Sequence, residues 1–231
     1  DPPYGIGYIG GGGWANGIRQ RERKGIENDE LVGAQLHSFL LKSLGLMKER
    51  LKQGGSIYVC CADSALGQPF SQAMLELDLW RERGGELVWV KNRMQFGRTD
   101  YQYQHERILY GWKEGAGHYF TSDRTKTTTL FFKRPAMSKA HPTMKPVDLV
   151  RELVMNSSRR GEIVIDGFGG SGTTLIACAT VGREARLIEL QPHYCDIIRR
   201  RWGSFATRYG LEVGDGIVDD GKTGAENFDN K

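Results

Sequence analysis

The chain has 231 residues and a mass of 25.9 kDa, which fits one α/β domain and leaves ample room for a buried core. Hydrophobic residues make up 39% of it, charged residues 26% and aromatic residues 10%, so collagen-like, mucin-like and wholly disordered chains are excluded. Lysine and arginine total 32 against 28 acidic residues, and the resulting charge of +4 permits a polyanionic partner without requiring one.

The first third of the chain predicts a loop, a helix and a buried strand. Glycines crowd residues 5–13, which indicates a flexible loop. Over residues 30–51 apolar side chains recur every three or four positions, the spacing of an amphipathic helix. The apolar run 56–62, with the sequence SIYVCCA, is bounded by turn residues and predicts a strand buried on both faces of a parallel sheet.

The middle of the chain predicts an antiparallel pair of strands and an irregular insertion. A helix is predicted over about residues 65–83, and two strands follow at 86–91 and 107–112. The few residues between these strands cannot form a crossover helix, so we expect the pair to be antiparallel. Residues 113–140 mix glycine, threonine, serine and lysine, and we expect contacts that decide specificity there.

The remainder alternates between helices and strands. The predicted elements are a helix at 145–157, a strand at 163–166, a helix at 171–181, a strand at 185–189 and a helix at 192–205. This alternation indicates an α/β fold with a doubly wound, mostly parallel, Rossmann-like sheet and one antiparallel strand. Residues 215–231 carry five acids and two lysines with almost no apolar side chains, and they predict a disordered acidic tail.

Neither a membrane span nor a metal site is expected. No stretch approaches the roughly 18 apolar residues of a membrane span, and the start of the chain does not resemble a signal peptide. We therefore expect a cytoplasmic protein with no membrane association. Cys60, Cys61, Cys178 and Cys195 form no CxxC pair and no Cys/His cluster, which indicates buried, reduced thiols.

A glycine-rich turn, DGFGGSGTT from Asp166 to Thr174, follows one strand and opens the next helix. At the carboxyl end of a parallel strand such glycines let the backbone approach a ligand, and the N–H groups of the helix start can donate to it, so we expect a nucleotide-like ligand. No lysine follows the last glycine, which excludes a Walker loop. Glu189 closes the next strand, where its carboxylate can accept both hydroxyl protons of a ribose.

The chain begins with Asp1-Pro2-Pro3-Tyr4. Two prolines fix φ and lack N–H groups, so rigid backbone carbonyls stand beside the Asp1 carboxylate as acceptors. These acceptors suit an amino group, and the ring of Tyr4 offers a face on which a base can stack. A plain loop is the alternative interpretation of this segment.

The segment HPTMKP, residues 141–146, lies at the start of a predicted helix. Thr143 can serve as its N-cap, and Lys145 can offer a cation to a carboxylate. Taken alone, the segment could simply start a helix. The three segments nevertheless each account for a different part of one pair of ligands, namely a nucleotide-like ligand and a base that carries an amino group.

In these segments the chain resembles the β class of DNA amino-methyltransferases, which use S-adenosylmethionine. DPPY resembles the catalytic motif of that family, HPTMKP its motif X and DGFGGSGTT its cofactor motif, and Glu189 falls at the acidic position that follows. This order of motifs is that of the β class. The segments WVK, QHE and PHYCDIIRRRW look like modification methylases of prophages and of proteins with partition-type domains.

The resemblance implies transfer of a methyl group to the exocyclic amine of a DNA base. Asp1 and the carbonyl of Pro2 would hold the amine, and Tyr4 would stack on the flipped base. The implied cofactor-binding residues are Thr143, Lys145, Asp166, Phe168, Gly170, Gly172, Thr173 and Glu189. DPPY rather than SPPY favours adenine N6, with cytosine N4 as the alternative, and cytosine C5 is disfavoured because no cysteine follows a proline.

Double-stranded DNA is the implied partner of a bacterial or phage-encoded, nucleoid-associated protein, and a homodimer is left open. The expected DNA-binding residues are Arg19, Arg21, Arg23 and Lys24, just after the catalytic segment, together with Lys91 and His105. His105 is equally well explained as a hydrogen-bonded histidine at a strand start. Within a catalytic domain spanning 1–214, segments at about 5–29 and 92–140 are expected to recognise the target.

The sequence departs from the family pattern in two places. Gly167 stands where the family usually has proline, which should loosen the turn. The family places a buried strand before DPPY, next to the strand that ends at Asp166, whereas this sequence starts at Asp1. We therefore expect a fragment or a trimmed chain with two exposed apolar strand edges, and a non-catalytic DNA-binding module is the alternative to an enzyme.

Overall fold

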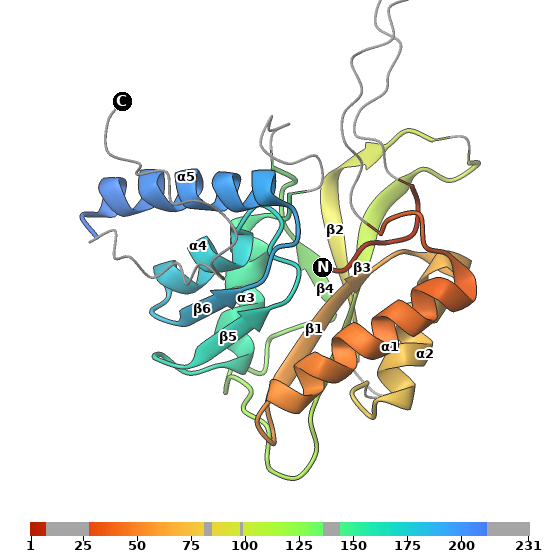
Figure 1. Ribbon diagram of the computed structural model, residues 1–231, viewed down its shortest axis with the longest axis horizontal. Coiled ribbons are helices and arrows are strands. Elements are labelled where there is room, and N and C mark those ends of the chain that lie inside the picture. Colours follow the sequence, from red (N-terminus) through yellow and green to blue (C-terminus); the bar gives the residue numbers. More distant parts are fainter. Residues whose placement is uncertain (8–27, 81–84, 98, 136–143, 212–231) are drawn as a thin grey trace, which may run out of the picture.

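The computed structural model describes residues 1–7, 28–80, 85–97, 99–135 and 144–211 (Figure 1). Its helices are α1 (Gly33–Arg50), α2 (Gln68–Glu76), α3 (Val147–Ser157), α4 (Thr173–Thr180) and α5 (Pro192–Tyr209), and the 3-10 turn η1 (Ser64–Gly67) leads into α2. Its strands are β1 (Ser56–Cys61), β2 (Glu86–Gln95), β3 (Tyr103–Trp112), β4 (Thr129–Phe131), β5 (Ile163–Asp166) and β6 (Glu184–Leu187). Within these ranges no helix has both the length and the apolarity that a membrane crossing needs.

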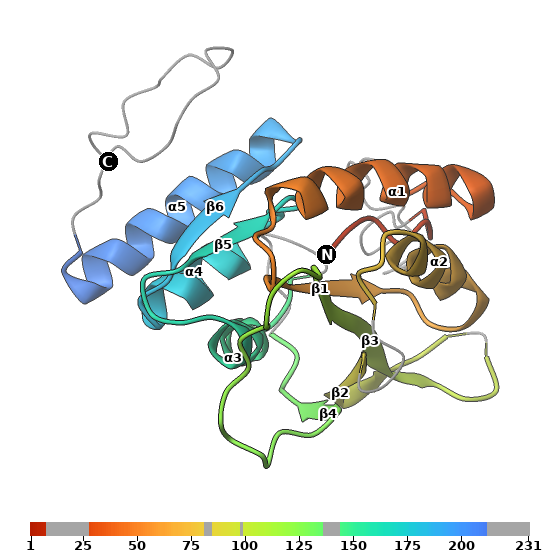
Figure 2. The same cartoon turned by 90° about the horizontal axis from the view of Figure 1, so that it is seen from below.

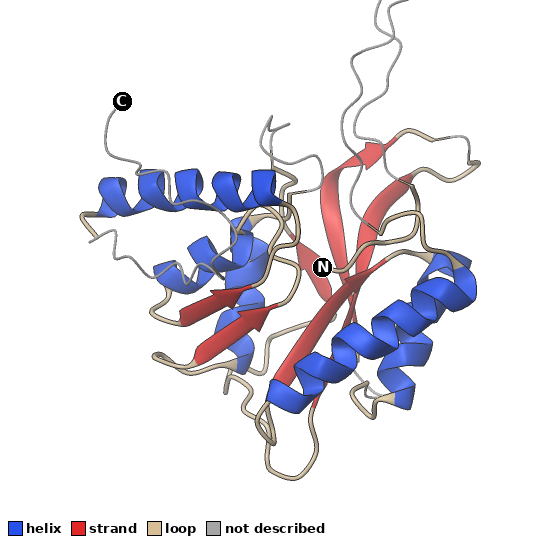
Figure 3. Cartoon of the chain, in the orientation of Figure 1, coloured by secondary structure: helices blue, strands red, loops and turns tan. Residues whose placement is uncertain are grey.

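The described strands form two separate sheets (Figure 3). In the larger sheet the strand order is β1-β3-β2-β4, and β3 runs antiparallel to both β1 and β2, whereas β4 runs parallel to β2. The smaller sheet is the parallel pair of β5 and β6. The predicted mostly parallel arrangement with one antiparallel strand is confirmed, and β3 is that strand.

Helices α1 and α2 cover one face of the larger sheet, and α3 packs on the other (Figure 2). On the first face Leu40 and Phe70 are completely buried. On the second face Trp89 and Ile108 pack against Leu149 of α3. Burial of a side chain of this size contributes about 1.5–3 kcal/mol relative to exposure, so both faces depend on their helices.

The predicted bounds of one helix and two strands are wrong. The helix predicted for 65–83 ends at Glu76, because Asp78 adopts a left-handed backbone with φ of 49° that a helix cannot continue. The strands predicted at 86–91 and 107–112 extend toward each other into a longer hairpin, 86–95 and 103–112. Most of the added residues are exposed, so they carry no alternation of apolar and polar side chains that could have indicated a strand.

The neighbouring edges of the two sheets, β1 and β5, each have a described strand on one side only. Ile163 and Ile165 on one face of β5 are exposed. Helix α1 contacts the larger sheet and the turn that follows β5. It packs on β1, and the ring of its Phe39 lies 6.1 Å from the ring of Phe168 in the turn after β5.

Candidate active site

Asp29 holds the DPPY segment in place. Because the two prolines lack N–H groups, the next backbone donors are those of Tyr4 and Gly5. Both donate to Asp29 Oδ1, over 2.8 and 3.0 Å, and Asp29 is only 2% exposed. A buried carboxylate that accepts two N–H groups fixes the turn that carries Asp1, although sequence reasoning did not include this residue in the site.

Lys145 joins Asp1 to Glu106. Its Nζ lies 2.9 Å from both carboxylate oxygens of Asp1 and 3.0 Å from Glu106 Oε2. It also donates to the Tyr4 hydroxyl over 3.1 Å, and that hydroxyl donates to Asp1 Oδ1 over 3.0 Å. Glu106 belongs to β3 and Lys145 immediately precedes α3, so three distant segments of the chain meet at the N-terminal residue, which is marked in Figure 1.

Lys91 of β2 completes this group, since its Nζ lies 2.8 Å from Glu106 Oε1. Each oxygen of Glu106 therefore pairs with a different lysine. Lys91 and Lys145 are only 6% and 8% exposed, and buried charges are tolerated only when they are paired. We call Asp1, Tyr4, Lys91, Glu106 and Lys145 the ion network, in which two ammonium groups balance two carboxylates.

In the ion network, the combined effect of ion pairing on the pKa values of Glu106 and Lys145 is larger than the effect of burial. Burial alone would raise the pKa of Glu106, but Lys145 and Lys91 together hold that pKa at about 2. Burial alone would lower the pKa of Lys145, whereas Glu106 raises that pKa above its usual value. Burial and the Glu106 carboxylate raise the pKa of Tyr4 well above its usual value. At neutral pH Glu106 is therefore an anion, Lys145 a cation and Tyr4 a neutral hydroxyl.

Asp166 closes the glycine-rich turn after β5. Its Oδ1 accepts the Phe168 N–H over 3.0 Å, and its Oδ2 accepts the Thr174 hydroxyl over 2.6 Å. The turn enters α4 through Gly172, whose φ of 77° lies in the left-handed region that favours glycine. No side chain in the described part of the chain caps α4, which leaves the N–H groups of its first turn to a ligand.

Glu189, just after β6, faces the same turn. Its Oε2 accepts the Gly170 N–H over 2.7 Å, and its Oε1 accepts the Gln191 N–H over 2.8 Å. A carboxylate can accept about four hydrogen bonds, so about two remain for hydroxyl groups of a ligand. Ile188 and Leu190 on either side are exposed and offer apolar surface beside the carboxylate.

A hydrogen bond joins this turn to the ion network. Thr173, the first residue of α4, donates its hydroxyl to the Lys145 carbonyl over 3.4 Å. The backbone of Lys145 thus contacts the start of α4 while its ammonium contacts Asp1. The glycine-rich turn and the DPPY segment therefore both contact Lys145.

Helix α1 occupies the space beside Gly167. A Cβ atom at Gly167 would lie 2.0 Å from the terminal methyl group of Met47. Glycine at this position therefore lets the α1 side chain approach the turn closely, which gives a packing reason for the departure from proline. The looser turn expected from this substitution stays a prediction.

Several predicted site residues lie outside the described residues or take a place other than the predicted one. Thr143, Arg19, Arg21, Arg23 and Lys24 lie outside the described residues. Lys91 was assigned to DNA, but it is buried in the ion network. His105 is partly exposed, with its Nε2 3.4 Å from Asp63 Oδ1, and its role at DNA stays a prediction.

Sequence reasoning did not assign a role to Glu106, although the sequence contains a signal for it. Glu106 stands two residues before the buried Ile108, and Lys91 stands two residues after the buried Trp89. Since side chains alternate between the faces of a strand, both charges point to the core face that α3 covers. A charged residue at a core-facing strand position indicates a buried ion pair.

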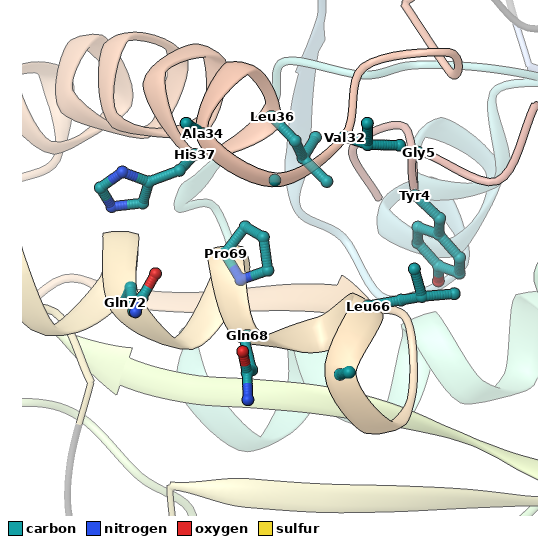
Figure 4. Close-up of a pocket in the computed structure, with 12 residues that line it drawn as sticks. Tyr4, Gly5, Val32, Ala34, Leu36, His37, Leu66, Gln68, Pro69 and Gln72 are labelled. Carbon is teal, nitrogen blue, oxygen red and sulfur yellow. The ribbon is translucent and has the colours of Figure 1, made fainter.

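A cavity of about 350 Å³ lies beside Tyr4, between the start of α1 and the start of α2 (Figure 4). Leu36, Leu66 and Pro69 give it apolar walls, and Gln72 adds an amide. Its size falls in the range of ligand pockets. Tyr4 is the member of the ion network that lines it, so the cavity lies next to that network rather than within it.

All four cysteines are free thiols, and of the predicted buried thiols Cys61 and Cys178 are buried, whereas Cys60 and Cys195 are half-buried. Burial raises the pKa of Cys61 and of Cys178 to about 12, so both stay protonated at neutral pH. Among the described residues, no group of three or more His, Cys, Asp or Glu side chains could hold a metal ion.

Comparisons with known proteins agree on one family. The model of the DNA methylases termed N6_N4_Mtase matches residues 1–200. The Type II methyltransferase M2.DpnII of Streptococcus pneumoniae is 28% identical over 220 residues, which cover 87% of this chain and 80% of that protein. The solved M1.HpyAVI–SAM complex has a TM-score of 0.60 at 22% identity, covering 72% of this chain and 81% of that one. The cytosine-N4-specific PvuII DNA methyltransferase has a TM-score of 0.60 at 15% identity, covering 81% and 80%. The chain therefore belongs to the N6/N4 family of DNA methylases, as its resemblance to the β class predicted.

Proposed function

We propose that the protein transfers the methyl group of S-adenosylmethionine to the exocyclic amine of a base flipped out of duplex DNA, with adenine N6 as the target. One observation carries the proposal. Lys145 joins the Asp1 carboxylate to the start of α4, so an acceptor for an amine lies beside a site that suits a nucleoside. No covalent bond to the protein is required, because holding the two reacting groups in line supplies much of the rate.

The acceptors for the target amine are the Asp1 carboxylate and the Pro2 carbonyl. By accepting hydrogen bonds from both N–H groups of the amine, they favour a pyramidal nitrogen whose lone pair points at the methyl carbon. Bound S-adenosylmethionine supplies an electrophilic methyl group on a sulfonium, which becomes a neutral thioether as the new N–C bond forms. Asp1 takes the proton that the amine loses, and the neighbouring Lys145 keeps the carboxylate in place.

The surroundings of the glycine-rich turn fit this cofactor. Glu189 has hydrogen-bonding capacity left for the two ribose hydroxyl groups after it accepts two backbone N–H groups. The uncapped start of α4 offers N–H groups to the carboxylate at the amino-acid end. Exposed Ile188 and Leu190 offer apolar surface to the adenine ring. Asp166 acts indirectly, by closing the turn.

We assign the tip of the β2–β3 hairpin to DNA contact. Phe96 and Tyr101 at this tip are 81% and 92% exposed, and exposed aromatic rings offer faces on which bases stack. The exposed Arg93 adds a cation for a phosphate group. The hairpin projects from the larger sheet above the N-terminal residue (Figure 1). A duplex held here would present a flipped base to Asp1, with the basic residues 19–24 as further predicted phosphate contacts.

The choice of adenine over cytosine rests on the acidic first residue of DPPY. The cytosine-N4-specific PvuII enzyme shares the fold at only 15% identity, so its specificity does not transfer to this chain. A homodimer stays a prediction, which sedimentation of the purified protein at several concentrations tests.

The proposal is tested by incubating plasmid DNA with the purified protein and S-adenosylmethionine and then analysing the nucleosides. We expect N6-methyladenine from the wild type and none from Asp1→Ala. N4-methylcytosine would overturn the base assignment. Titration of S-adenosylmethionine in the absence of DNA separates an enzyme from a non-catalytic DNA-binding module. The enzyme must bind the cofactor, and the absence of detectable binding would favour the module.

A further inference from the structure

We infer that Glu106 is a positioning residue whose two oxygens hold Lys91 and Lys145 apart and thereby leave the Asp1 carboxylate able to accept the target amine. The inference rests on the proposed function of Asp1. Glu106 acts through the two lysines rather than by touching the reacting atoms.

Glu106 separates the ammonium groups of Lys91 and Lys145, because each of its oxygens pairs with one of them. Its Oε1 lies 2.8 Å from Lys91 Nζ, and its Oε2 lies 3.0 Å from Lys145 Nζ. The side chain starts from a fixed place, because Glu106 pairs with Trp89 in the register of β2 and β3. Lys145 stands between the two carboxylates, 2.9 Å from each oxygen of Asp1. Glu106 therefore determines how strongly Lys145 is drawn to Asp1.

The charge of Glu106 matters because the ion network is balanced only when it is present. Without that charge, both ammonium groups would share Asp1 as the remaining carboxylate of the network. Lys145 would then bind Asp1 more tightly and compete with the amine for its lone pairs. Two cations would also stand beside an amine that becomes positively charged as it attacks the methyl group, which opposes transfer.

No other titratable group in the described surroundings takes over this role. The groups that face Glu106 and its lysines, besides Asp1, are Tyr4, Asp63, His105, Arg107 and the thiols of Cys60 and Cys61. Tyr4 and Cys61 remain neutral, since burial raises the pKa of each. Asp63 already faces His105, and burial raises the pKa of its carboxyl.

The test compares four proteins with the wild type. Glu106→Gln removes one negative charge and keeps the shape, and Lys91→Met removes one positive charge. The double variant Glu106→Gln with Lys91→Met restores the balance of charges. Glu86→Gln is the matched control, because Glu86 is a partly exposed carboxylate of β2 that pairs with Arg107 over 2.8 and 2.9 Å, outside the ion network.

We expect Glu106→Gln to lower kcat at neutral pH by at least about 100-fold, the size of losing an oriented electrostatic group, with an unchanged KM for S-adenosylmethionine. Its rate should recover as the pH rises, because a buried lysine without a partner loses its proton more easily. The double variant should regain most of the lost rate, and Glu86→Gln should behave as the wild type.

A second readout does not depend on activity. Carbon-13 NMR of labelled lysine side chains should show one lysine that titrates near neutral pH in Glu106→Gln and in neither the wild type nor the double variant. The inference is also supported if Glu106→Gln fails to fold while the double variant folds.

The inference is contradicted if the double variant is no faster than Glu106→Gln, if no lysine titrates early, or if both variants fail to fold. Failure of the proposed function looks different. If the wild type transfers no methyl group to any DNA base, that function is contradicted, and the lysine titration alone then decides the role of Glu106.

Discussion

The ion network and the glycine-rich turn hold their carboxylates in different ways. Asp1 and Glu106 are paired with lysine side chains that come from β2 and from the segment before α3. Asp166 and Glu189 instead accept backbone N–H groups, with one threonine hydroxyl. Backbone donors persist in any variant, whereas a lysine can be removed. The network should therefore be sensitive to single substitutions and decide the chemical step, while the turn should tolerate them better and decide cofactor affinity.

The largest expected effect is that of Lys145→Met. This substitution removes the buried Lys145 ammonium and leaves the more exposed Asp1 carboxylate and one oxygen of the partly buried Glu106 without their cation. Breaking a buried pair from one side costs about 3 kcal/mol or more. We expect the free energy of unfolding in urea to fall by about that amount. The control is Lys52→Met, whose surface pair with Glu162 should matter little. If both variants lost the same free energy of unfolding, the ion network would be no more important for stability than a surface ion pair.

The ion network should also produce an acid-dependent loss of stability. Glu106 has a pKa of about 2 in the folded protein, below its usual value of 4.5. A carboxyl with a lowered folded pKa stabilises the protein above its unfolded pKa, and this contribution is lost as the pH falls through the folded pKa. The stability difference between the wild type and Glu106→Gln should therefore be full above pH 4.5 and shrink toward pH 2.

Urea unfolding of both proteins across that pH range measures this difference. A difference that stays constant down to the lowest pH would show that the carboxylate charge of Glu106 does not stabilise the fold.

A smaller effect is expected in the glycine-rich turn. Glu189→Gln removes the charge that accepts the Gly170 N–H, but the backbone donors remain. We expect KM for S-adenosylmethionine to rise about tenfold, the loss of one charged hydrogen bond, with little change in kcat. Steady-state kinetics separate the two parameters, and Glu184→Gln on the exposed side of β6 serves as the control. A fall in kcat alone would contradict the division between binding and chemistry.

The smallest effect is expected at the β2–β3 hairpin. Replacing Phe96 and Tyr101 together by alanine should weaken duplex binding about fivefold, because apolar contact with bases is lost while the fold is untouched. Fluorescence anisotropy with labelled duplex DNA measures the change, and the exposed Tyr209 replaced by alanine is the control. DNA affinity equal to that of the wild type would place the DNA surface elsewhere.

The sequence predicted the glycine-rich turn better than it predicted the ion network, for a physical reason. The turn is local, because the strand before it, its glycines and the helix after it are contiguous, and Glu189 follows one element later. The ion network joins Asp1, Lys91, Glu106 and Lys145 through space, and only the register of β2 against β3 brings the middle two together. Sequence spacing alone carries no information about that register.

The same reasoning explains the errors in the fold. Helix α1 was predicted within a few residues because its buried leucines recur at helical spacing. The outer half of the β2–β3 hairpin was missed because its side chains are exposed on both faces. The end of α2 was missed because it depends on the left-handed backbone of Asp78, which no periodicity reports. Long-range contacts and single backbone dihedrals are what remained beyond prediction.

The most direct test of the central claim is the transfer of a radiolabelled methyl group from S-adenosylmethionine to duplex DNA by the wild type and by Asp1→Asn. The asparagine keeps the shape and an acceptor oxygen but loses the charge that takes the amine proton and pairs with Lys145. We predict that the wild type labels an exocyclic amine, and that Asp1→Asn is at least about 100-fold slower with unchanged cofactor binding. Transfer by Asp1→Asn at the wild-type rate would contradict the account.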